Sequence, residues 1–215
     1  MDRLARASPD ARRLWMVEHH VRSRGIANPL VLEAMRVVPR EAFVPEEFAD
    51  AAYDDCALPI ADDQTISQPY IVALMVEAAG TALTSRVLEV GTGSGYGAAV
   101  LSRVAGHVWS VERLAGLAAA AALRLARLGY SNVSVVSGDG ACGWPDGSPY
   151  DAVVVTAAAP SVPADLVSQL APGGRLVMPV GSCDGYQQLT VLRRLADNEG
   201  VETAVLAPVR FVPLL

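Results

Sequence analysis

A run of apolar residues that ends in three alternating glycines is the feature that most limits how this chain can fold. Residues 87–90 read Val-Leu-Glu-Val, and Gly91, Gly93 and Gly95 follow. Successive apolar residues are typical of a central parallel strand, which is covered on both faces. Glycines at its end let the main chain turn sharply and approach a ligand where a Cβ atom would collide. Residues 98–104 have helical composition, so the sequence predicts a strand–loop–helix unit that opens toward a nucleotide-like ligand.

Strand and helix patterns alternate along the rest of the chain. We expect strands near 86–90, 107–112, 133–137, 151–156 and 174–180, and helices near 95–105, 113–129 and 162–171. This alternation predicts a mostly parallel sheet with helices on both faces. Two more apolar segments, near 187–194 and 201–212, are separated by a short turn at 197–200 and predict an antiparallel hairpin at the sheet edge. The predicted fold is therefore α/β, Rossmann-like, with seven strands.

The first 80 residues predict helices and a binding loop. A helix is expected over 12–24, and Asn28-Pro29 can begin a second one. The apolar side of this second helix would comprise Leu30, Val31, Ala34, Met35 and Val38. Residues 49–69 predict a long irregular stretch, which is typical of binding loops, and a helix should follow from Pro69 to about Ala79. We expect a single domain over 1–215, with these elements in 1–80 and the α/β core in 81–215.

The composition and net charge limit the classes of protein to which this chain can belong. The chain has 215 residues, of which 52% are hydrophobic and 19% charged, which is typical of a globular protein rather than a disordered one. Its net charge of −6 argues against an extended nucleic-acid surface. No apolar segment of signal-peptide length precedes Arg12, and the alanine-rich run 114–123 is too short to span a membrane. We expect a cytoplasmic monomer with no nucleic-acid or membrane partner.

Cysteine and histidine spacing predicts no metal site. The three cysteines and three histidines lack the paired spacing of metal ligands; they are Cys56, Cys142, Cys183, His19, His20 and His107. Reduced thiols are the simplest interpretation of the cysteines.

Two cofactor classes compete for the glycine loop. Residues 93–98 satisfy the dinucleotide fingerprint with Ala98 in the last place. Counted from the strand end, however, the loop begins at Gly91 and the third fingerprint position becomes Tyr96. A bulky residue there would hold the helix away from the strand, so the dinucleotide interpretation is strained.

Three acidic residues favour S-adenosylmethionine. Glu89 lies inside the apolar strand, where an unpaired carboxylate would be costly, so the amino group of the cofactor is a reasonable partner. Glu112 ends the next strand, where it could accept both ribose hydroxyls, although an NAD site would use the same residue. Asp139, between two glycines after the third strand, could accept from the adenine amino group. Glu112 could instead be a helix-start charge and Asp139 a turn residue, but the three together favour the methyl donor.

Several separated segments resemble one family, the protein-L-isoaspartate O-methyltransferases, along nearly the whole chain. The segments are Val38–Val44 with Pro45, Gln64-Thr65-Ile66-Ser67-Gln68-Pro69, Val87–Tyr96, Gly138-Asp139-Gly140, Gln169–Val177 with Pro179-Val180-Gly181, and Phe211-Val212-Pro213-Leu214. Many methyltransferases share the glycine loop. The Thr-Ile-Ser-Gln-Pro segment and the Val-Pro-Leu ending make the match specific.

The resemblance implies a class I methyltransferase fold and methylation of the free carboxylate of L-isoaspartyl residues, with S-adenosylhomocysteine as the product. It implies Ser67 as the central catalytic residue, although the same serine could cap the helix after Pro69. It implies a cofactor site made of Thr65, Ile66, Ser67, Gln68, Pro69, Glu89, Gly91, Thr92, Gly93, Ser94, Gly95, Tyr96, Glu112, Asp139 and Gly140. It implies substrate contacts at Ala158, Ala159, Pro160, Val212 and Pro213, where small residues let a peptide main chain come close.

The sequence departs from the family pattern at Asp63, where the family usually has glycine, and Tyr70 occupies a variable position. Only Leu215 follows the Val-Pro-Leu ending, so we expect a reduced lid over the cofactor. Alternatives are a related carboxyl methyltransferase that serves one peptide partner and makes succinimide, and a non-catalytic S-adenosylmethionine-binding module. A nucleic-acid methyltransferase is disfavoured, because residues 157–160 are Ala-Ala-Ala-Pro rather than polar and aromatic.

Overall fold

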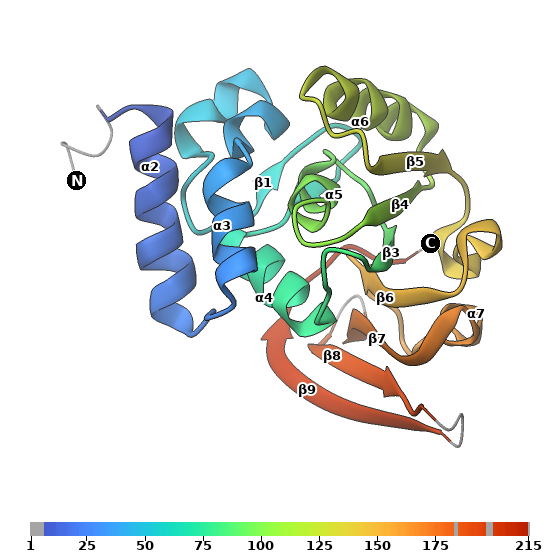
Figure 1. Cartoon of the computed structure of the whole chain (residues 1–215). Coiled ribbons are helices and arrows are strands. Elements are labelled where there is room, and N and C mark those ends of the chain that lie inside the picture. Colours follow the sequence, from blue (N-terminus) through green and yellow to red (C-terminus); the bar gives the residue numbers. More distant parts are fainter. Residues whose placement is uncertain (1–6, 183–184, 197–199, 215) are drawn as a thin grey trace.

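A seven-stranded sheet runs through the centre of the molecule (Figure 1). The computed structural model describes residues 7–182, 185–196 and 200–214. The strands, in chain order, are β3 (Arg86–Val90), β4 (His107–Glu112), β5 (Val133–Ser137), β6 (Tyr150–Val155), β7 (Leu170–Gly181), β8 (Gln187–Arg194) and β9 (Val201–Val209). Their order in the sheet is β5-β4-β3-β6-β7-β8-β9. The strands from β5 to β7 are parallel, whereas β8 is antiparallel to both of its neighbours. The predicted sheet and its C-terminal hairpin are confirmed.

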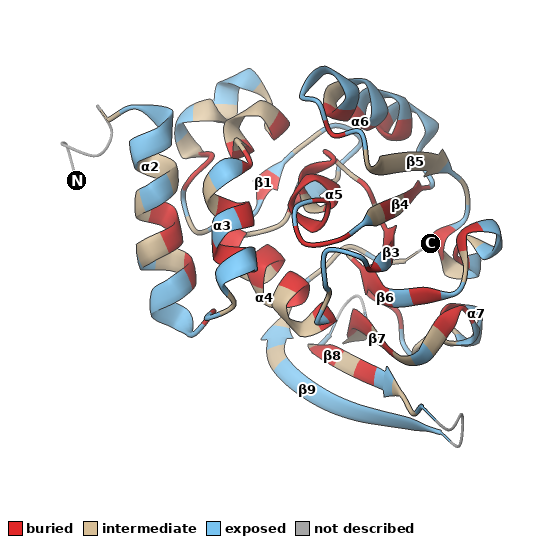
Figure 2. Ribbon diagram, in the orientation of Figure 1, coloured by how far each residue is buried: buried red, intermediate tan, exposed pale blue. Residues whose placement is uncertain are grey.

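Helices cover both faces of the sheet, unequally. One face carries α4 (Pro69–Ala79), α5 (Tyr96–Leu101) and α6 (Ala115–Arg127), whose apolar residues share one core with Val87 and Val154. The opposite face carries the short α7 (Ala164–Ser168), whose Leu166 packs with Leu88 and Val153. Figure 2 shows buried residues concentrated in this central layer. Alternating side chains of the same strand therefore enter two different cores, as a two-residue strand period requires.

Two N-terminal helices lie on the outer side of this assembly, beside α4 (Figure 1). Helix α2 (Pro9–Met16) continues through further helical turns to Arg24 and ends at Gly25, whose φ of 101° is left-handed. Helix α3 (Pro29–Val37) begins where predicted, because Asn28 accepts a hydrogen bond from the Leu30 N–H at 2.9 Å. Of the five residues expected on the apolar side of this helix, Val31, Ala34, Met35 and Val38 are buried, whereas Leu30 in the first turn of α3 is 42% exposed.

The segment between Ala49 and Pro69 has more structure than predicted. It contains the end of a 3-10 helix (Glu46–Ala51) and two short antiparallel strands, β1 (Leu58–Pro59) and β2 (Thr65–Ile66). Asp62 and Asp63 make the turn between the strands, with φ of 58° and 55°. Aspartate tolerates this left-handed conformation better than most residues. The turn therefore needs no glycine, and the sequence lacked the glycine signal from which a turn would have been predicted. The Ile60 side chain in this turn lies over Gly93 of the glycine loop.

In the part of the chain that the structure describes, no helix is long and apolar enough to cross a bilayer. Cys56 and Cys142 are exposed and unpaired. Cys183 and turn residues 197–199 lie outside the described residues. The predicted boundary between residues 80 and 81 falls just after α4 and stays a prediction.

Candidate active site

A pocket of about 910 Å³ opens at the carboxyl ends of β3, β4 and β6. Here the chain leaves β3 through α5 toward β4, whereas it leaves the neighbouring β6 through α7 toward β7 on the opposite face. Such a switch point is the usual ligand position in open α/β folds. Three parts of the chain form its walls: residues 57–72, the segments after the central strands, and residues 208–214. The N-terminal segment, the core and the C-terminal segment therefore meet at one site.

The glycine loop has the geometry that its sequence predicts. Gly91, Gly93 and Gly95 adopt φ of 93°, 52° and 90°, which residues with a side chain rarely adopt. A Cβ atom on Gly91 would collide with the Thr156 hydroxyl, and one on Gly97 would collide with the carboxylate of Glu89. The main chain thus lies as close to the pocket floor as glycine allows.

Glu89 forms part of that floor and is 1% exposed. The Ser110 hydroxyl donates to its Oε2 at 2.5 Å, and the Thr92 hydroxyl lies 2.6 Å from that of Ser110. Burial raises the pKa of Glu89 to about 8; the hydrogen bond from Ser110 opposes this shift and the nearby Glu112 adds to it. Within the described residues no cationic side chain pairs with Glu89. No described side chain therefore takes the place of the cationic partner that the sequence predicts, the amino group of the cofactor.

Glu112 at the end of β4 connects the loop to the next helix. Its Oε2 accepts from the Gly93 N–H at 2.8 Å, and its Oε1 accepts from the Leu114 N–H at 3.0 Å. An ionised carboxylate has about four acceptor positions, so both oxygens keep capacity for hydroxyl groups in the pocket. The helix-start role and the ligand role are compatible here.

Ser67 lines the pocket and lies immediately after β2 in the chain. The N-cap of α4 is Gln68, which makes no side-chain cap, and the Gln68 amide donates instead to the Asp55 carbonyl at 2.8 Å. Among the described residues the Ser67 hydroxyl makes no hydrogen bond, so capping does not engage it. A free hydroxyl thus faces the pocket.

Comparison with known proteins decides the family. The family model described as protein-L-isoaspartate(D-aspartate) O-methyltransferase matches residues 12–215. The chain belongs to this family. A relative from Geotalea uraniireducens, named protein-L-isoaspartate O-methyltransferase 1, is 56% identical over 204 residues, covering 95% of this chain and 93% of its own. A relative with the same enzyme name from Rhodopseudomonas palustris (strain ATCC BAA-98 / CGA009) is 56% identical over 200 residues, covering 93% and 91%.

Solved structures agree with the family assignment. A protein-L-isoaspartate O-methyltransferase matches with a TM-score of 0.84 and 30% identity over 95% of this chain and 65% of the longer matched chain. A Plasmodium falciparum protein-L-isoaspartate O-methyltransferase, crystallised with S-adenosyl-L-homocysteine, matches with a TM-score of 0.79 and 25% identity over 94% and 98%. The resemblance predicted from the sequence is confirmed.

The structure brings most of the predicted site residues of this methyltransferase fold to the pocket wall. These are Thr65, Ile66, Ser67, Gln68, Glu89, Gly91, Thr92, Gly93, Ser94, Tyr96, Glu112, Gly140, Val212 and Pro213. Pro69 and Gly95 are buried behind the wall. Tyr96 also points away from the loop into the N-terminal layer, where its ring lies 5.7 Å from that of Phe43.

Asp139 lies beside the pocket rather than on its wall. It is exposed, and its Oδ1 accepts from the Ala141 N–H at 2.9 Å, which is the capping role that its glycine neighbours allow. Gly140 does line the pocket, and a Cβ atom there would collide with Val90. The proposed adenine contact of Asp139 stays a prediction.

The segment after β6 supports the C-terminal wall from behind. The Ala158 N–H donates to the Val212 carbonyl at 2.8 Å, and the Leu214 N–H donates to the Ala158 carbonyl at 2.7 Å. Ala159 is bonded in the same way to Pro179 and Gly181, and Pro160 is exposed. Ala158 therefore holds the segment of Val212 and Pro213 in place, whereas Ala159 is bonded to β7. With these main-chain groups occupied, no direct substrate contact follows from the position of Ala158 or Ala159.

Sequence reasoning missed four residues at or next to the pocket. Thr156 donates to the Gly91 carbonyl at 2.8 Å, and a hydroxyl residue that ends an apolar strand was a usable signal. Ser110 is the buried partner of Glu89, and its place in an apolar strand was a weaker signal. Arg210 and Asp62 line the pocket from segments far apart in the sequence, and no local pattern predicts that.

Proposed function

We propose that this chain transfers a methyl group from S-adenosylmethionine to the free carboxylate of L-isoaspartyl residues in proteins and peptides. The observation that carries the proposal is one pocket of about 910 Å³ that is lined both by a buried carboxylate without a cationic side-chain partner among the described residues, Glu89, and by a hydroxyl without a protein partner among them, Ser67. The family assignment and the relative crystallised with S-adenosyl-L-homocysteine support the same cofactor.

The residues present fit this cofactor. An unpaired buried carboxylate is costly, and the amino group of the methionine part offers Glu89 a cationic partner. Glu112 retains acceptor capacity for ribose hydroxyls, and the glycines leave room for close approach. When bound, the cofactor supplies a methyl group activated on a sulfonium sulfur.

The protein has to position the acceptor rather than deprotonate it. A substrate carboxylate is ionised near neutral pH and can attack without a general base. The Ser67 hydroxyl can donate a hydrogen bond to one carboxylate oxygen and direct the other toward the methyl group. Val212 and Pro213 form the neighbouring edge of the wall.

Repair follows the methyl transfer without further help from the enzyme. Methoxide leaves an ester carbonyl more readily than oxide leaves a carboxylate. The adjacent main-chain nitrogen therefore attacks the carbonyl carbon of the methyl ester, and methoxide leaves with the proton of that nitrogen as methanol, which gives a succinimide. Hydrolysis of the succinimide returns part of the material to normal aspartyl linkage.

Radiolabelled methyl donor with paired peptides tests the proposal. One peptide contains isoaspartate and the other contains aspartate in the same sequence. We expect base-labile methanol release from the isoaspartyl peptide alone. Equal labelling of the two peptides, or labelling of neither, would contradict the proposed acceptor.

A monomeric state is also part of this proposal. Sedimentation velocity across a concentration series checks it, and we expect a single species near 22.5 kDa. The cytoplasmic location stays a prediction.

A further inference from the structure

Strand β9 forms an edge of the sheet whose outer side has no neighbouring strand among the described residues. It is last in the strand order and pairs with β8 alone. Residues 201–206 are all exposed, with Val201 at 47%, Val205 at 54% and Leu206 at 39%. Free edges are commonly blocked by charges, proline or a bulge, because their unpaired N–H and C=O groups can bind another strand.

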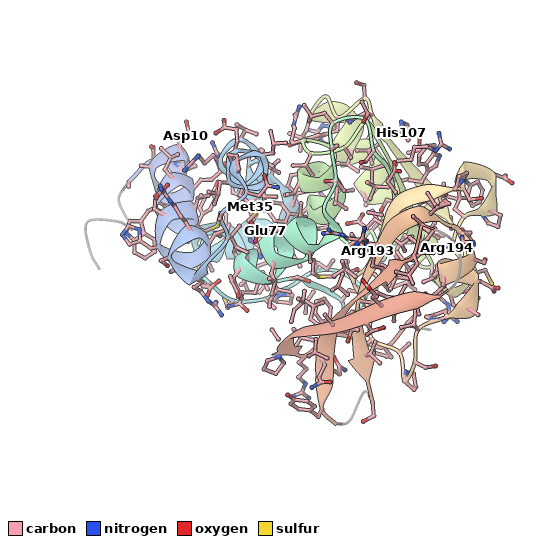
Figure 3. All side chains as sticks on the ribbon, turned by 60° about the horizontal axis from the view of Figure 1, so that its bottom comes forward. Asp10, Met35, Glu77, His107, Arg193 and Arg194 are labelled. Carbon is pink, nitrogen blue, oxygen red and sulfur yellow. The ribbon has the colours of Figure 1, made fainter. Side chains whose placement is uncertain are left out.

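The blocking features of β9 lie only at one end. The pairing with β8 shifts at Leu206, and Pro208 follows. Residues 201–205 contain a single charged side chain, Glu202, and no proline. Figure 3, in which the bottom of Figure 1 comes forward, shows β9 foremost, and Figure 2 shows most of its length exposed. This stretch is therefore open to an extended partner.

The same strand leads into the active site. Pro208 and Val209 at its end line the pocket, and Arg210–Leu214 continue the wall. An extended chain lying on the free edge of β9 would therefore reach the pocket after about four residues from Val205, or about eight from Val201, at roughly 3.4 Å per residue.

The length of the free edge and the low side-chain selectivity of main-chain pairing both favour a substrate segment as the partner of β9. Five residues of edge extend over about 17 Å, which is too short a strip to bury the roughly 1,200 Å² of a stable dimer interface. Transient pairing with a substrate segment needs no such area. Main-chain pairing also carries little side-chain selectivity, which suits an enzyme whose substrates share a damaged linkage and not a sequence.

We propose that the free edge of β9, residues 201–205, binds an extended segment of the substrate polypeptide as an added antiparallel strand. Since β9 runs toward the pocket, the bound segment is the one that follows the isoaspartyl residue on its C-terminal side. This inference rests on the proposed function and names how the substrate chain is held outside the pocket.

The test compares uncharged isoaspartyl peptides with end groups blocked. A core hexapeptide that ends at the isoaspartyl residue is extended by four or eight residues on its C-terminal side, or by eight on its N-terminal side. We expect about a tenfold lower KM for the eight-residue C-terminal extension only, because several new main-chain hydrogen bonds are partly offset by ordering the peptide. The four-residue extension should gain little, since it ends near Val205.

Variants of the edge decide whether β9 causes the gain. Val205→Lys places a charge on the edge and should raise KM for the long peptide about tenfold, without changing the hexapeptide. Leu123→Lys is the matched control, because Leu123 is 63% exposed on α6 and receives the same charge. Thr203→Pro and Ala204→Pro form a second pair, because neighbouring residues point their N–H groups to opposite edges of the strand. One of the two prolines therefore removes an N–H donor from the free edge and leaves the pairing with β8 intact, whereas the other removes a donor that faces β8.

Each outcome has a fixed meaning. No gain from extension, a gain on the N-terminal side, or a gain that survives Val205→Lys overturns the inference. A concentration-dependent dimer that Val205→Lys abolishes also overturns it, since the edge then belongs to a second copy of the chain. If the hexapeptide itself is not methylated, the proposed function fails instead.

Discussion

At the scale of single residues, Glu89 has the most unusual environment. It is buried, its pKa is raised to about 8, and its protein partner is the uncharged Ser110. In the absence of cofactor this carboxyl group therefore carries a proton at neutral pH. A cationic ligand group favours the ionised form, so binding and proton release are linked.

Stability of the cofactor-free protein should depend on pH through Glu89. The unfolded chain loses this proton near pH 4.5 and the native protein near pH 8. The stability contributed by the neutral form is complete below pH 4.5 and is lost as pH rises to 8, on the order of 5 kcal/mol. We expect denaturant unfolding to show this decline in the wild type relative to Glu89→Gln. Parallel pH profiles for the two proteins would show that Glu89 is not neutral in the native state.

Ser67→Ala should separate turnover from cofactor affinity. The hydroxyl has no protein partner among the described residues and is proposed to orient the acceptor, so we expect turnover to fall about 10- to 100-fold. The dissociation constant of S-adenosylhomocysteine, measured by calorimetry, should change little. Glu89→Ala should give the opposite pattern, with weaker cofactor binding. A loss of affinity in Ser67→Ala as large as its loss of turnover would place Ser67 in the cofactor site alone.

Asp63 departs from the usual glycine and adopts a left-handed conformation with φ of 55°. Asp63→Gly should therefore stabilise the protein by about 1 kcal/mol, because glycine adopts this conformation without strain. Asp54→Gly is the control: Asp54 is exposed in the same segment and is not among the residues with positive φ. There glycine should destabilise. Denaturant midpoints of both variants check the pair, and equal changes would rule out backbone strain at Asp63.

At the scale of elements, the sequence predicted those strands whose bounds are set by the local pattern of apolar and turn residues. The bounds of β3, β4 and β5 agree with the expected ranges, since apolar strands ending in turn residues are unambiguous. The β1–β2 hairpin was missed, because its strands are two residues long and Asp62 and Asp63 replace the usual glycine signal.

The site was predictable to the same extent. Residues on the glycine loop and at strand ends reach the pocket because the strand directions place them there. The position of Ala158 behind the C-terminal wall depends on pairing with Val212 and Leu214, more than 50 residues away in the chain. No local pattern contains that pairing.

Helix α5 provides a test of the close approach to the pocket floor. Gly97 lies inside this helix, and it is not among the residues with positive φ. Gly97→Ala should nevertheless weaken cofactor binding at least tenfold, because the new Cβ atom displaces the Glu89 carboxylate.

The control is Gly116→Ala in α6, where a Cβ atom meets no atom closer than 4.0 Å. This change should raise stability by about 1 kcal/mol, as expected for alanine in a helix. Thermal unfolding and calorimetric titration of both variants make the comparison. Undiminished cofactor binding in Gly97→Ala would show that Glu89 moves freely.

At the scale of the whole molecule, the pocket couples three segments that are distant in sequence. Residues 62–68, the glycine loop and residues 208–214 all face the same space. Saturation with S-adenosylhomocysteine should therefore slow amide hydrogen exchange in all three together, since opening any one of them exposes the ligand. Protection confined to the glycine loop would show that the other two walls open independently. The N-terminal helix α2, which is absent from the pocket wall, serves as the internal reference.

The strand order has a consequence for how the enzyme is assembled. From β3 to β5, and again from β6 to β9, successive strands along the chain are also neighbours in the sheet. In the sheet, the pairing of β3 with β6 joins these two halves across about 60 residues of chain, and closing such a long loop costs conformational entropy. The cofactor pocket lies at this seam, where Thr156 at the end of β6 bonds to Gly91 after β3. Because the pocket exists only where the two halves meet, cofactor binding reports that they have joined.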